Sequence, residues 1–335
     1  MILRVATRRV VDIILSRFGF RLIRKSVLID WQKRWWGHKV ELPKGAEEYL
    51  TQDNDRLVEL TGLYASMDTS VTTPSVWTSE HLGPSDLKYF RSDNPYVWQF
   101  QDHNFEPAYV LTTYYVKTID TLGLLEKLKE DDEFGIYTFR ADGRVVSRDF
   151  LDSIVEIYFL EKHLGISRLP QISLLDIGAG YGRLAHRIVE ALPNIDYCFC
   201  TDAIPASTFI CEYYLRFRNV CGKARVVPLN QVEDLLANHA IDIAVNVNSF
   251  SECTLATIDW WLSRLAKHKV QYLMIVPNFI DPDGRLLLVR HPHEDFLPLV
   301  EEKGYRLLAK EPKYRDPVVQ QYGVSPTCHY LFGLS

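Results

Sequence analysis

The stretch Leu174-Leu-Asp-Ile-Gly-Ala-Gly-Tyr-Gly-Arg183 decides the fold. It begins with a short apolar run, reaches an acidic residue at Asp176, and then contains glycine at Gly178, Gly180 and Gly182. Helical spacing follows from Arg183, so the stretch predicts a strand, a tight turn and a helix in immediate succession. Glycines allow the backbone to pass close to a bound ligand, and the free N–H groups of a helix N-terminus attract a carboxylate.

Asp202 extends this pattern, because it ends the next predicted strand, where a carboxylate can accept both hydroxyls of a ribose. Asp176 is placed to engage the methionine part of a ligand or its ammonium group. The two acids and the glycine turn together predict a site for S-adenosylmethionine. The residues expected to contact this cofactor are Asp176, Gly178, Ala179, Gly180, Gly182, Asp202, Ala203, Leu229, Asn230, Asn246, Asn248 and, for its carboxylate, Arg148.

A dinucleotide such as NAD or FAD is the main alternative ligand, since Asp202 would serve its ribose equally well. The frame from Gly178 departs from G-x-G-x-x-G because position 183 is arginine, whereas the frame from Gly180 is a tolerable match. Asp176 would bring a carboxylate near a pyrophosphate, which favours the methyl donor. For Asn246 and Asn248, which interrupt an apolar strand, a structural hydrogen-bond network is an equal alternative to ligand contact.

From Ile172 the chain alternates short apolar runs with amphipathic helices, as a doubly wound parallel sheet does. We expect strands at 172–177, 197–201, 224–228, 241–247, 270–276, 305–310 and 329–332, and helices at 183–192, 206–217, 231–238, 254–268 and 294–303. No helix separates the last two strands, so they should pair antiparallel. The predicted class is α/β, with a Rossmann-like seven-stranded sheet of the class I methyltransferase kind that ends in an antiparallel hairpin. This hairpin stands where a dinucleotide enzyme has its second nucleotide-binding half.

Three regions are expected along the chain. Residues 1–36 form a basic amphipathic segment, which predicts a helix that either lies on an anionic membrane surface or packs on its own protein with its charges solvated. Residues 37–165 form a mostly helical accessory and substrate-binding region, with helical patterns over about 109–130 and from Leu151 to His163, the second capped by Asp149. Residues 166–335 form the S-adenosylmethionine-binding catalytic domain.

Composition excludes several classes of protein. The net charge of −5 gives no overall attraction to nucleic acid. No apolar run reaches the roughly 18 residues of a membrane-spanning helix. The six cysteines have no CxxC spacing and mostly lie in or beside apolar runs, which favours reduced core residues in a cytoplasmic protein. No clustered ligand spacing supports a metal site, and the oligomeric state is not indicated.

Several segments resemble the bacterial sugar O-methyltransferase family. They are Leu174 to Arg187, Asp202-Ala-Ile-Pro205, Asn248-Ser-Phe-Ser-Glu-Cys253, Val276-Pro-Asn278, Tyr96-Val-Trp98, Val146-Ser-Arg-Asp-Phe-Leu-Asp-Ser153, Gly304-Tyr305 and Pro312-Lys-Tyr314. The glycine motif is common to class I methyltransferases, so the specificity rests on the other segments. The resemblance implies O-methylation of a saccharide in surface-polysaccharide or glycan biosynthesis by a cytoplasmic enzyme. Methylation of another small-molecule hydroxyl, or a catalytically inactive partner subunit that binds S-adenosylmethionine, are the alternatives.

Methyl transfer from a sulfonium is an in-line displacement, and a weakly acidic sugar hydroxyl calls for a general base. The candidates at the carboxyl edge of the sheet are Glu252, His291 and His293. Glu252 can equally be an acid that answers a helix dipole, and the histidines can belong to a solvated loop. Further substrate contacts are expected upstream, although aromatic side chains there are more often core: His103, Glu80, Trp77, Trp98, Tyr96 and Phe100.

Overall fold

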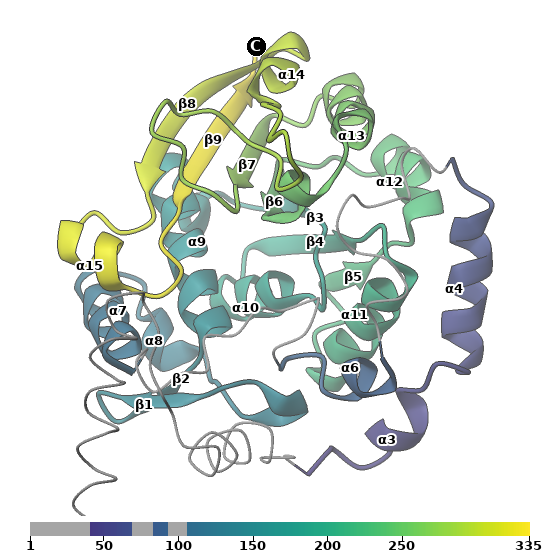
Figure 1. Cartoon of the computed structure of the whole chain (residues 1–335), viewed down its shortest axis with the longest axis horizontal. Coiled ribbons are helices and arrows are strands. Elements are labelled where there is room, and N and C mark those ends of the chain that lie inside the picture. The colour runs from purple at the N-terminus through teal and green to yellow at the C-terminus, as the bar shows by residue number, and fades with distance from the viewer. Residues whose placement is uncertain (1–40, 69–82, 93–105) are drawn as a thin grey trace, which may run out of the picture. The chain divides into compact units, whose positions relative to one another are not determined.

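A seven-stranded sheet in the order β5-β4-β3-β6-β7-β9-β8 organises the fold (Figure 1). The computed structural model describes residues 41–68, 83–92 and 106–335. The strands of this sheet are β3 (Ile172–Ile177), β4 (Ile195–Thr201), β5 (Ala224–Val226), β6 (Ile243–Val247), β7 (Tyr272–Val276), β8 (Tyr305–Pro312) and β9 (Cys328–Leu334). The five strands β3 to β7 run parallel, and β9 lies antiparallel between β7 and β8. The predicted Rossmann-like sheet with its C-terminal antiparallel hairpin is confirmed.

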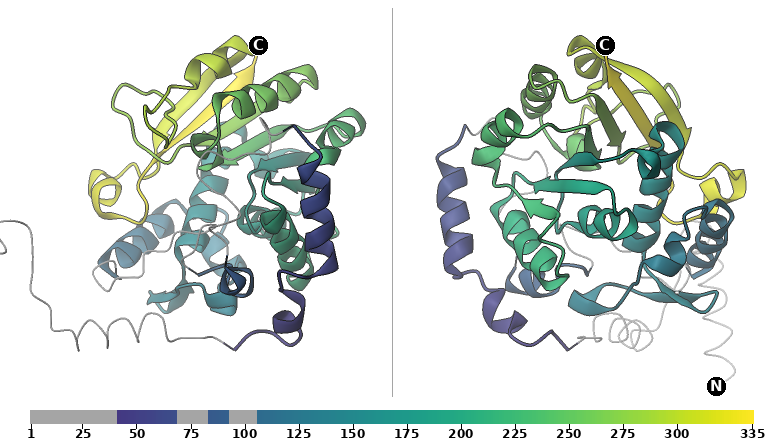
Figure 2. Two further views of the ribbon diagram at one scale, coloured as in Figure 1. Left: turned by 45° about the vertical axis from the view of Figure 1, so that its right-hand side comes forward. Right: turned by 180° about the vertical axis from the view of Figure 1, so that it is seen from behind.

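Helices cover both faces of the sheet, so its central strands are mostly apolar and buried. β3 has all six residues buried. Right-handed crossovers bring α10 (Arg183–Ala191) and α11 (Pro205–Phe217) to one face, and α12 (Val232–Asn238) and α13 (Leu255–Lys267) to the other (Figures 1 and 2). The helix α14 (Leu297–Glu302) packs beside α13. The expectation that no helix separates the last two strands is wrong, because α15 (Pro317–Tyr322) lies between β8 and β9 in the chain, although the two strands still pair antiparallel.

The segment before the sheet is helical, as predicted, but more broken than its pattern suggested. It contains α3 (Ala46–Tyr49), α4 (Asp55–Ala65), α6 (Pro84–Lys88), α7 (Glu106–Ile119) and α8 (Leu124–Lys127). The single helix expected over 109–130 is wrong, because Gly123 has a φ of 68° and ends the continuity between α7 and α8. Asp120 accepts the backbone N–H groups of Leu124 and Leu125 and so caps the second piece. A short hairpin of β1 (Phe139–Ala141) and β2 (Arg144–Val146) follows.

The helix α9 (Arg148–Leu164) joins the accessory region to the sheet. Its first thirteen residues are buried, and it packs against α10. The cap is Ser147, whose hydroxyl accepts the N–H of Phe150 at 3.0 Å. The expectation that Asp149 caps this helix is therefore wrong. The carboxylate of Asp149 instead accepts the hydroxyl of Tyr181 at 2.5 Å, which ties the start of α9 to the glycine turn.

Some expectations concern residues outside the described ranges: the segment 1–36, and the upstream candidates His103, Glu80, Trp77, Trp98, Tyr96 and Phe100. Within the described ranges, none of the helices has the length and apolar character needed to cross a membrane. The cysteines are free thiols; Cys198, Cys200, Cys211 and Cys328 are buried, Cys253 is partly buried, and Cys221 is exposed.

Candidate functional site

A cavity of about 630 Å³ opens at the carboxyl edge of the parallel strands. This volume is within the range of roughly 300–1,000 Å³ that is usual for small-molecule and cofactor sites. Its walls come from the glycine turn after β3, the end of β4, the segments after β6 and β7, and the buried face of α9. Residues 325–327 between α15 and β9, and His329 in β9, complete them. Segments that are far apart in the sequence thus share one site.

The glycine turn is fixed by its own backbone hydrogen bonds. The N–H groups of Gly178 and Ala179 donate to the carbonyl oxygen of Thr201, and that of Gly180 donates to Asp202 Oδ2 at 3.1 Å. Gly178 has a φ of 73°, and a Cβ there would lie 2.1 Å from Ser249 Oγ. Glycine is therefore required at 178 by both backbone conformation and space. A Cβ on Gly180 would meet no atom within 4 Å, because this residue borders the open cavity.

Asp176 contributes a buried carboxylate to the wall of the site. It lines the cavity from the end of β3 and is 5% exposed, yet no described residue donates a hydrogen bond to its carboxylate. Burial raises the pKa of Asp176 to about 7, although the nearby Arg183 acts in the opposite direction. A buried carboxylate without a donor is unfavourable unless a ligand supplies one.

Asp202 holds the turn and also faces the cavity. Its Oδ1 accepts the N–H of Ile204 at 2.9 Å, while Oδ2 accepts that of Gly180. Burial raises the pKa of Asp202 to about 6; the two backbone donors lower it, and the charge of Glu252 raises it. These two N–H donors orient the carboxylate and leave it further acceptor capacity towards the cavity.

The wall formed by α9 carries charged residues that the sequence analysis missed, apart from Arg148. Glu156 accepts two hydrogen bonds from the guanidinium of Arg183, at 2.7 and 2.8 Å. Asp152 pairs with Lys313 Nζ at 2.5 Å and with Arg148 Nε at 3.3 Å. The spacing of Asp149, Asp152 and Glu156 places them on one helical face, and polar residues on an otherwise buried face were the available signal.

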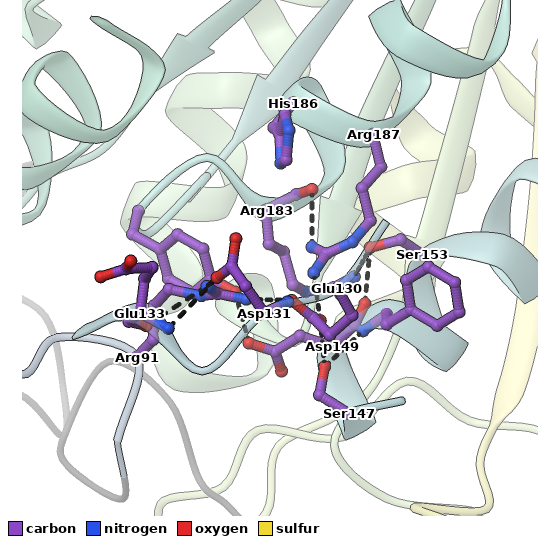
Figure 3. A network of polar contacts seen from close by, with 12 residues as sticks. Arg91, Glu130, Asp131, Glu133, Ser147, Asp149, Ser153, Arg183, His186 and Arg187 are labelled. Atoms are coloured by element: carbon purple, nitrogen blue, oxygen red, sulfur yellow. Dashed lines mark hydrogen bonds and ion pairs between the residues drawn. The ribbon is translucent and has the colours of Figure 1, made fainter. Parts of the chain in front are cut away.

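A buried ionic network behind this wall holds α9 and α10 together (Figure 3). Glu130 accepts Arg91 at 2.6 Å and Arg187 at 2.7 Å, and it also accepts the hydroxyl of Ser147, the cap of α9. Burial alone would raise the pKa of Glu130, but Arg91 and Arg187 hold it at about 2. Removing one partner from such a network leaves a buried charge without compensation. Glu130 therefore fixes the start of α9, and with it Arg148 and Asp149, relative to α10.

The structure brings most of the predicted site residues together. Those that line the cavity are Asp176, Gly178, Ala179, Gly180, Asp202, Ala203, Asn248, Arg148 and Glu252. The remaining predicted residues, Gly182, Leu229, Asn230, Asn246, His291 and His293, do not line it.

Each of the cofactor candidates outside the cavity has another role or position. Gly182 has a φ of 86°, and a Cβ there would approach Cys211 Sγ to 2.8 Å, so it permits the packing of α10 on α11. Asn246 is fully buried; its amide donates to the carbonyl of Ile177 and accepts the N–H of Phe250, which matches the structural alternative. Leu229 is buried with its N–H bonded to the hydroxyl of Tyr64, whereas Asn230 is exposed.

The three candidate bases also separate. His291 and His293 are exposed in the segment before α14 and lie outside the cavity lining, and the ring of His293 bonds to the carbonyl oxygen of Leu288 at 2.9 Å. These two histidines were expected at the carboxyl edge of the sheet beside the cofactor, but neither lines the cavity. Glu252 does line the cavity, and its Oε1 accepts the side-chain amide of Asn278 at 2.8 Å. Among the described residues, no group of three or more His, Cys, Asp or Glu side chains is arranged to hold a metal ion.

No family model and no curated protein matches this chain. Solved structures with a similar chain path include the magnesium protoporphyrin IX methyltransferase ChlM of Synechocystis PCC 6803 with bound SAM. It is 12% identical, with 67% of this chain and 97% of that chain covered and a TM-score of 0.40. TrmK of M. capricolum in complex with S-adenosyl-homocysteine is 15% identical over 51% and 67% of the two chains, with a TM-score of 0.33.

The [4+2]-cyclase SpnF is similar to the same degree, at 13% identity over 68% and 94% of the two chains and a TM-score of 0.41. At these identities and scores, the assignment of a ligand to this chain depends on the cavity residues themselves.

Proposed function

We propose that this protein binds S-adenosylmethionine and transfers its methyl group to a hydroxyl of a sugar or glycan precursor. The observation that carries the proposal is the carboxylate of Asp176, which is buried, lacks a donor among the described residues and faces the cavity beside the glycine turn. The ammonium group of S-adenosylmethionine would supply the missing donor. Asp202, with its acceptor capacity towards the cavity, would accept the ribose hydroxyls.

The charges of the cavity suit a cationic ligand. Six carboxylates line it: Asp149, Asp152, Glu156, Asp176, Asp202 and Glu252. Only three arginine and lysine side chains do so: Arg148, Arg183 and Lys313. S-adenosylmethionine carries two positive groups, the sulfonium and the ammonium, and one carboxylate. A ligand with this charge would favour the ionised forms of Asp176 and Asp202, whose pKa values burial has raised.

The same geometry disfavours a dinucleotide. A pyrophosphate needs free backbone N–H donors at the glycine turn. In this protein the N–H groups of Gly178, Ala179 and Gly180 already donate to Thr201 and Asp202. The turn thus positions two acids and leaves these amides unavailable to phosphate oxygens.

The reaction is a balanced two-electron displacement. The acceptor oxygen forms a bond to the methyl carbon while the carbon–sulfur bond breaks. The electron pair of the carbon–sulfur bond passes to the sulfonium sulfur, which becomes the neutral thioether of S-adenosylhomocysteine. The hydroxyl proton leaves to a general base. We assign this role to Glu252, the one candidate base in the cavity lining, which Asn278 orients.

The saccharide acceptor and the cytoplasmic location rest on the sequence resemblance. Calorimetry with S-adenosylhomocysteine tests the cofactor, with NADH as the competing ligand. Micromolar binding of the first and weak binding of the second is the expected result, and the reverse order would reject the proposal. Labelled methyl transfer from S-adenosylmethionine into a panel of nucleotide sugars and glycan fragments tests the acceptor. Transfer only to non-sugar hydroxyls, or binding without transfer to any hydroxyl, would select one of the alternatives.

A further inference from the structure

We propose that the part of the cavity at the ends of β7 and β9 is the acceptor site, in which His329 binds a hydroxyl group and Phe279 contacts the apolar face of a ring. This inference rests on the proposed methyl transfer and adds the acceptor-binding residues to it. It is carried by a second unsatisfied polar group of the cavity and by an exposed aromatic side chain at the cavity mouth.

His329 is buried with 2% exposure, and it lines the cavity from the start of β9. Its ring packs edge-on against Phe159 of α9 with centroids 5.1 Å apart. No hydrogen bond to either ring nitrogen is formed by any residue in the described part of the chain. A buried imidazole usually has a partner, so its bare nitrogens at a cavity wall indicate that a ligand provides one.

The register of the sheet places His329 on the cofactor's face but away from the cofactor's strands. Asp176, Val245, Met274 and Leu331 lie side by side across β3, β6, β7 and β9, so their side chains share one face. His329 comes two residues before Leu331 in the antiparallel strand, hence on the same face and one pleat nearer the cavity edge. Three strand spacings, roughly 14 Å, separate it from β3. This leaves β3 and β6 to the donor and β7 and β9 to the acceptor.

The surroundings keep this imidazole neutral. Burial lowers the pKa of His329 to about 3, and the ammonium of Lys313 acts in the same direction. Lys313 itself is held by Asp152 and by the carbonyl oxygens of Val324 and Ser325. A neutral imidazole offers one donor and one acceptor, which matches a hydroxyl group better than a carboxylate or an ammonium.

Phe279 supplies the apolar part of the same site. It follows β7 by three residues, lines the cavity, and is 42% exposed. The ring of His293 stands edge-on to it, with centroids 5.9 Å apart, and the hydrogen bond between His293 Nδ1 and the carbonyl oxygen of Leu288 holds that ring. This contact gives His293 a supporting place behind Phe279 rather than at the reacting atoms. The acceptor that fits is a molecule with an apolar ring face and free hydroxyls, such as a pyranoside.

The test compares His329→Leu, which removes both nitrogens at similar volume, with His329→Gln, which keeps a donor and an acceptor. The probes are S-adenosylhomocysteine for binding, and labelled S-adenosylmethionine with the methyl glycosides of glucose, galactose, mannose and rhamnose for transfer. For His329→Leu we expect an unliganded Tm no lower than the wild type and an unchanged affinity for S-adenosylhomocysteine. Its kcat/KM for the acceptor should fall about 10- to 100-fold through KM, as for the loss of one or two hydrogen bonds. His329→Gln should recover part of this loss.

Phe279→Ala should raise KM for the glycoside in the same way, with Phe279→Tyr as its matched control. A His329→Leu variant with wild-type transfer, or with a Tm lowered by several degrees, would overturn the assignment, the second because it reveals a structural role. Wild-type protein that binds S-adenosylhomocysteine but methylates none of the glycosides would refute this acceptor site alone. Wild-type protein that does not bind S-adenosylhomocysteine would refute the proposed function as well.

Discussion

The backbone N–H of Gly180 donates a hydrogen bond of 3.1 Å to Asp202 Oδ2, which joins the turn after β3 to the end of β4. The glycine turn and the acid that follows the neighbouring strand are therefore one unit, and a change in either alters the cavity between them. Both carboxylate oxygens of Asp202 accept a backbone N–H, Oδ1 from Ile204 and Oδ2 from Gly180, and the carboxylate also lines the cavity. Its substitution should therefore affect both the turn and ligand binding.

Asp202→Asn should weaken S-adenosylhomocysteine binding by about 100-fold, since it removes the charge from two hydrogen bonds to a ribose. Isothermal calorimetry measures the loss. Asp196→Asn is the matched control, because Asp196 is a partly exposed aspartate on β4, the strand that Asp202 follows, and does not line the cavity. An equal loss in both variants would mean that the effect is not local to the site.

Asp176→Asn should stabilise the unliganded protein at pH 8 while it abolishes cofactor binding. The folded pKa of about 7 lies above the ordinary value of 3.8, so the folded state binds the proton more tightly than the unfolded state. The stability of the wild type should therefore fall as pH rises from about 4 to 7, by up to about 4 kcal/mol, and the variant should lack this slope. Thermal unfolding at pH 5 and pH 8 measures it. Parallel pH profiles of the two proteins would contradict the unsatisfied state of Asp176.

The affinity for S-adenosylhomocysteine should fall as pH is lowered from 8 to 5. Binding of the ribose needs ionised Asp202, whose pKa burial raises to about 6, so affinity should drop about tenfold per pH unit below that value. Asp176, with a pKa of about 7, should add to the dependence near neutrality. Asp202→Asn should remove the fall in affinity below pH 6. A wild-type affinity that does not change between pH 8 and pH 5 would argue against both acids as ligand contacts.

Gly178→Ala should destabilise the protein by roughly 2–4 kcal/mol, because a left-handed backbone and a severe contact act together. The added Cβ would lie 2.1 Å from Ser249 Oγ, so the double variant Gly178→Ala, Ser249→Gly should regain part of the stability. Gly180→Ala, with a φ of 56° and no atom near the new Cβ, isolates the conformational penalty. Denaturant unfolding of the set distinguishes them, and equal losses at 178 and 180 would remove the role of Ser249.

Glu252→Gln should lower kcat by about 100-fold or more while the affinity for S-adenosylhomocysteine stays within about threefold, as expected for a general base. Asn278→Ala should reduce kcat less, because it only frees the carboxylate that it orients. Single-turnover methyl transfer measures both. Glu252 is close enough to influence the pKa of Asp202. A parallel loss of cofactor affinity would therefore assign Glu252 to the donor instead.

The parts of this structure that the sequence predicted are those set by local pattern. The apolar run before Asp176, the glycines and the helix that follows are adjacent in the chain, so each could be inferred from its neighbours. The break at Gly123 was missed because apolar spacing continues across it, and the two three-residue strands β1 and β2 are too short to show a period. The observed strand bounds differ from the expected ones by a few residues.

The missed site residues depend on partners distant in sequence. Asp152 meets Lys313, and Asp149 meets Tyr181, only once α9 has packed on the sheet. For Asn246 the sequence left ligand contact and a structural network as equal alternatives, because its two partners, the carbonyl of Ile177 and the N–H of Phe250, are backbone groups with no sequence signal of their own. The sequence around His329 did not indicate a binding role, because the lack of a hydrogen-bond partner for its ring is visible only in the folded structure.

The position of β9 imposes an order on folding. It is the last strand of the sheet to be synthesised, yet it lies inside the sheet, between β7 and β8. Until it docks, β7 keeps an open edge and β8 has no neighbour, so a nascent chain exposes two unpaired strand edges of the kind that recruit other chains. The glycine turn and Asp202 precede β8 and β9 in the chain, whereas the wall that contains His329 forms only when β9 docks. The proposed acceptor side is therefore the part of the cavity that depends on closure of the sheet.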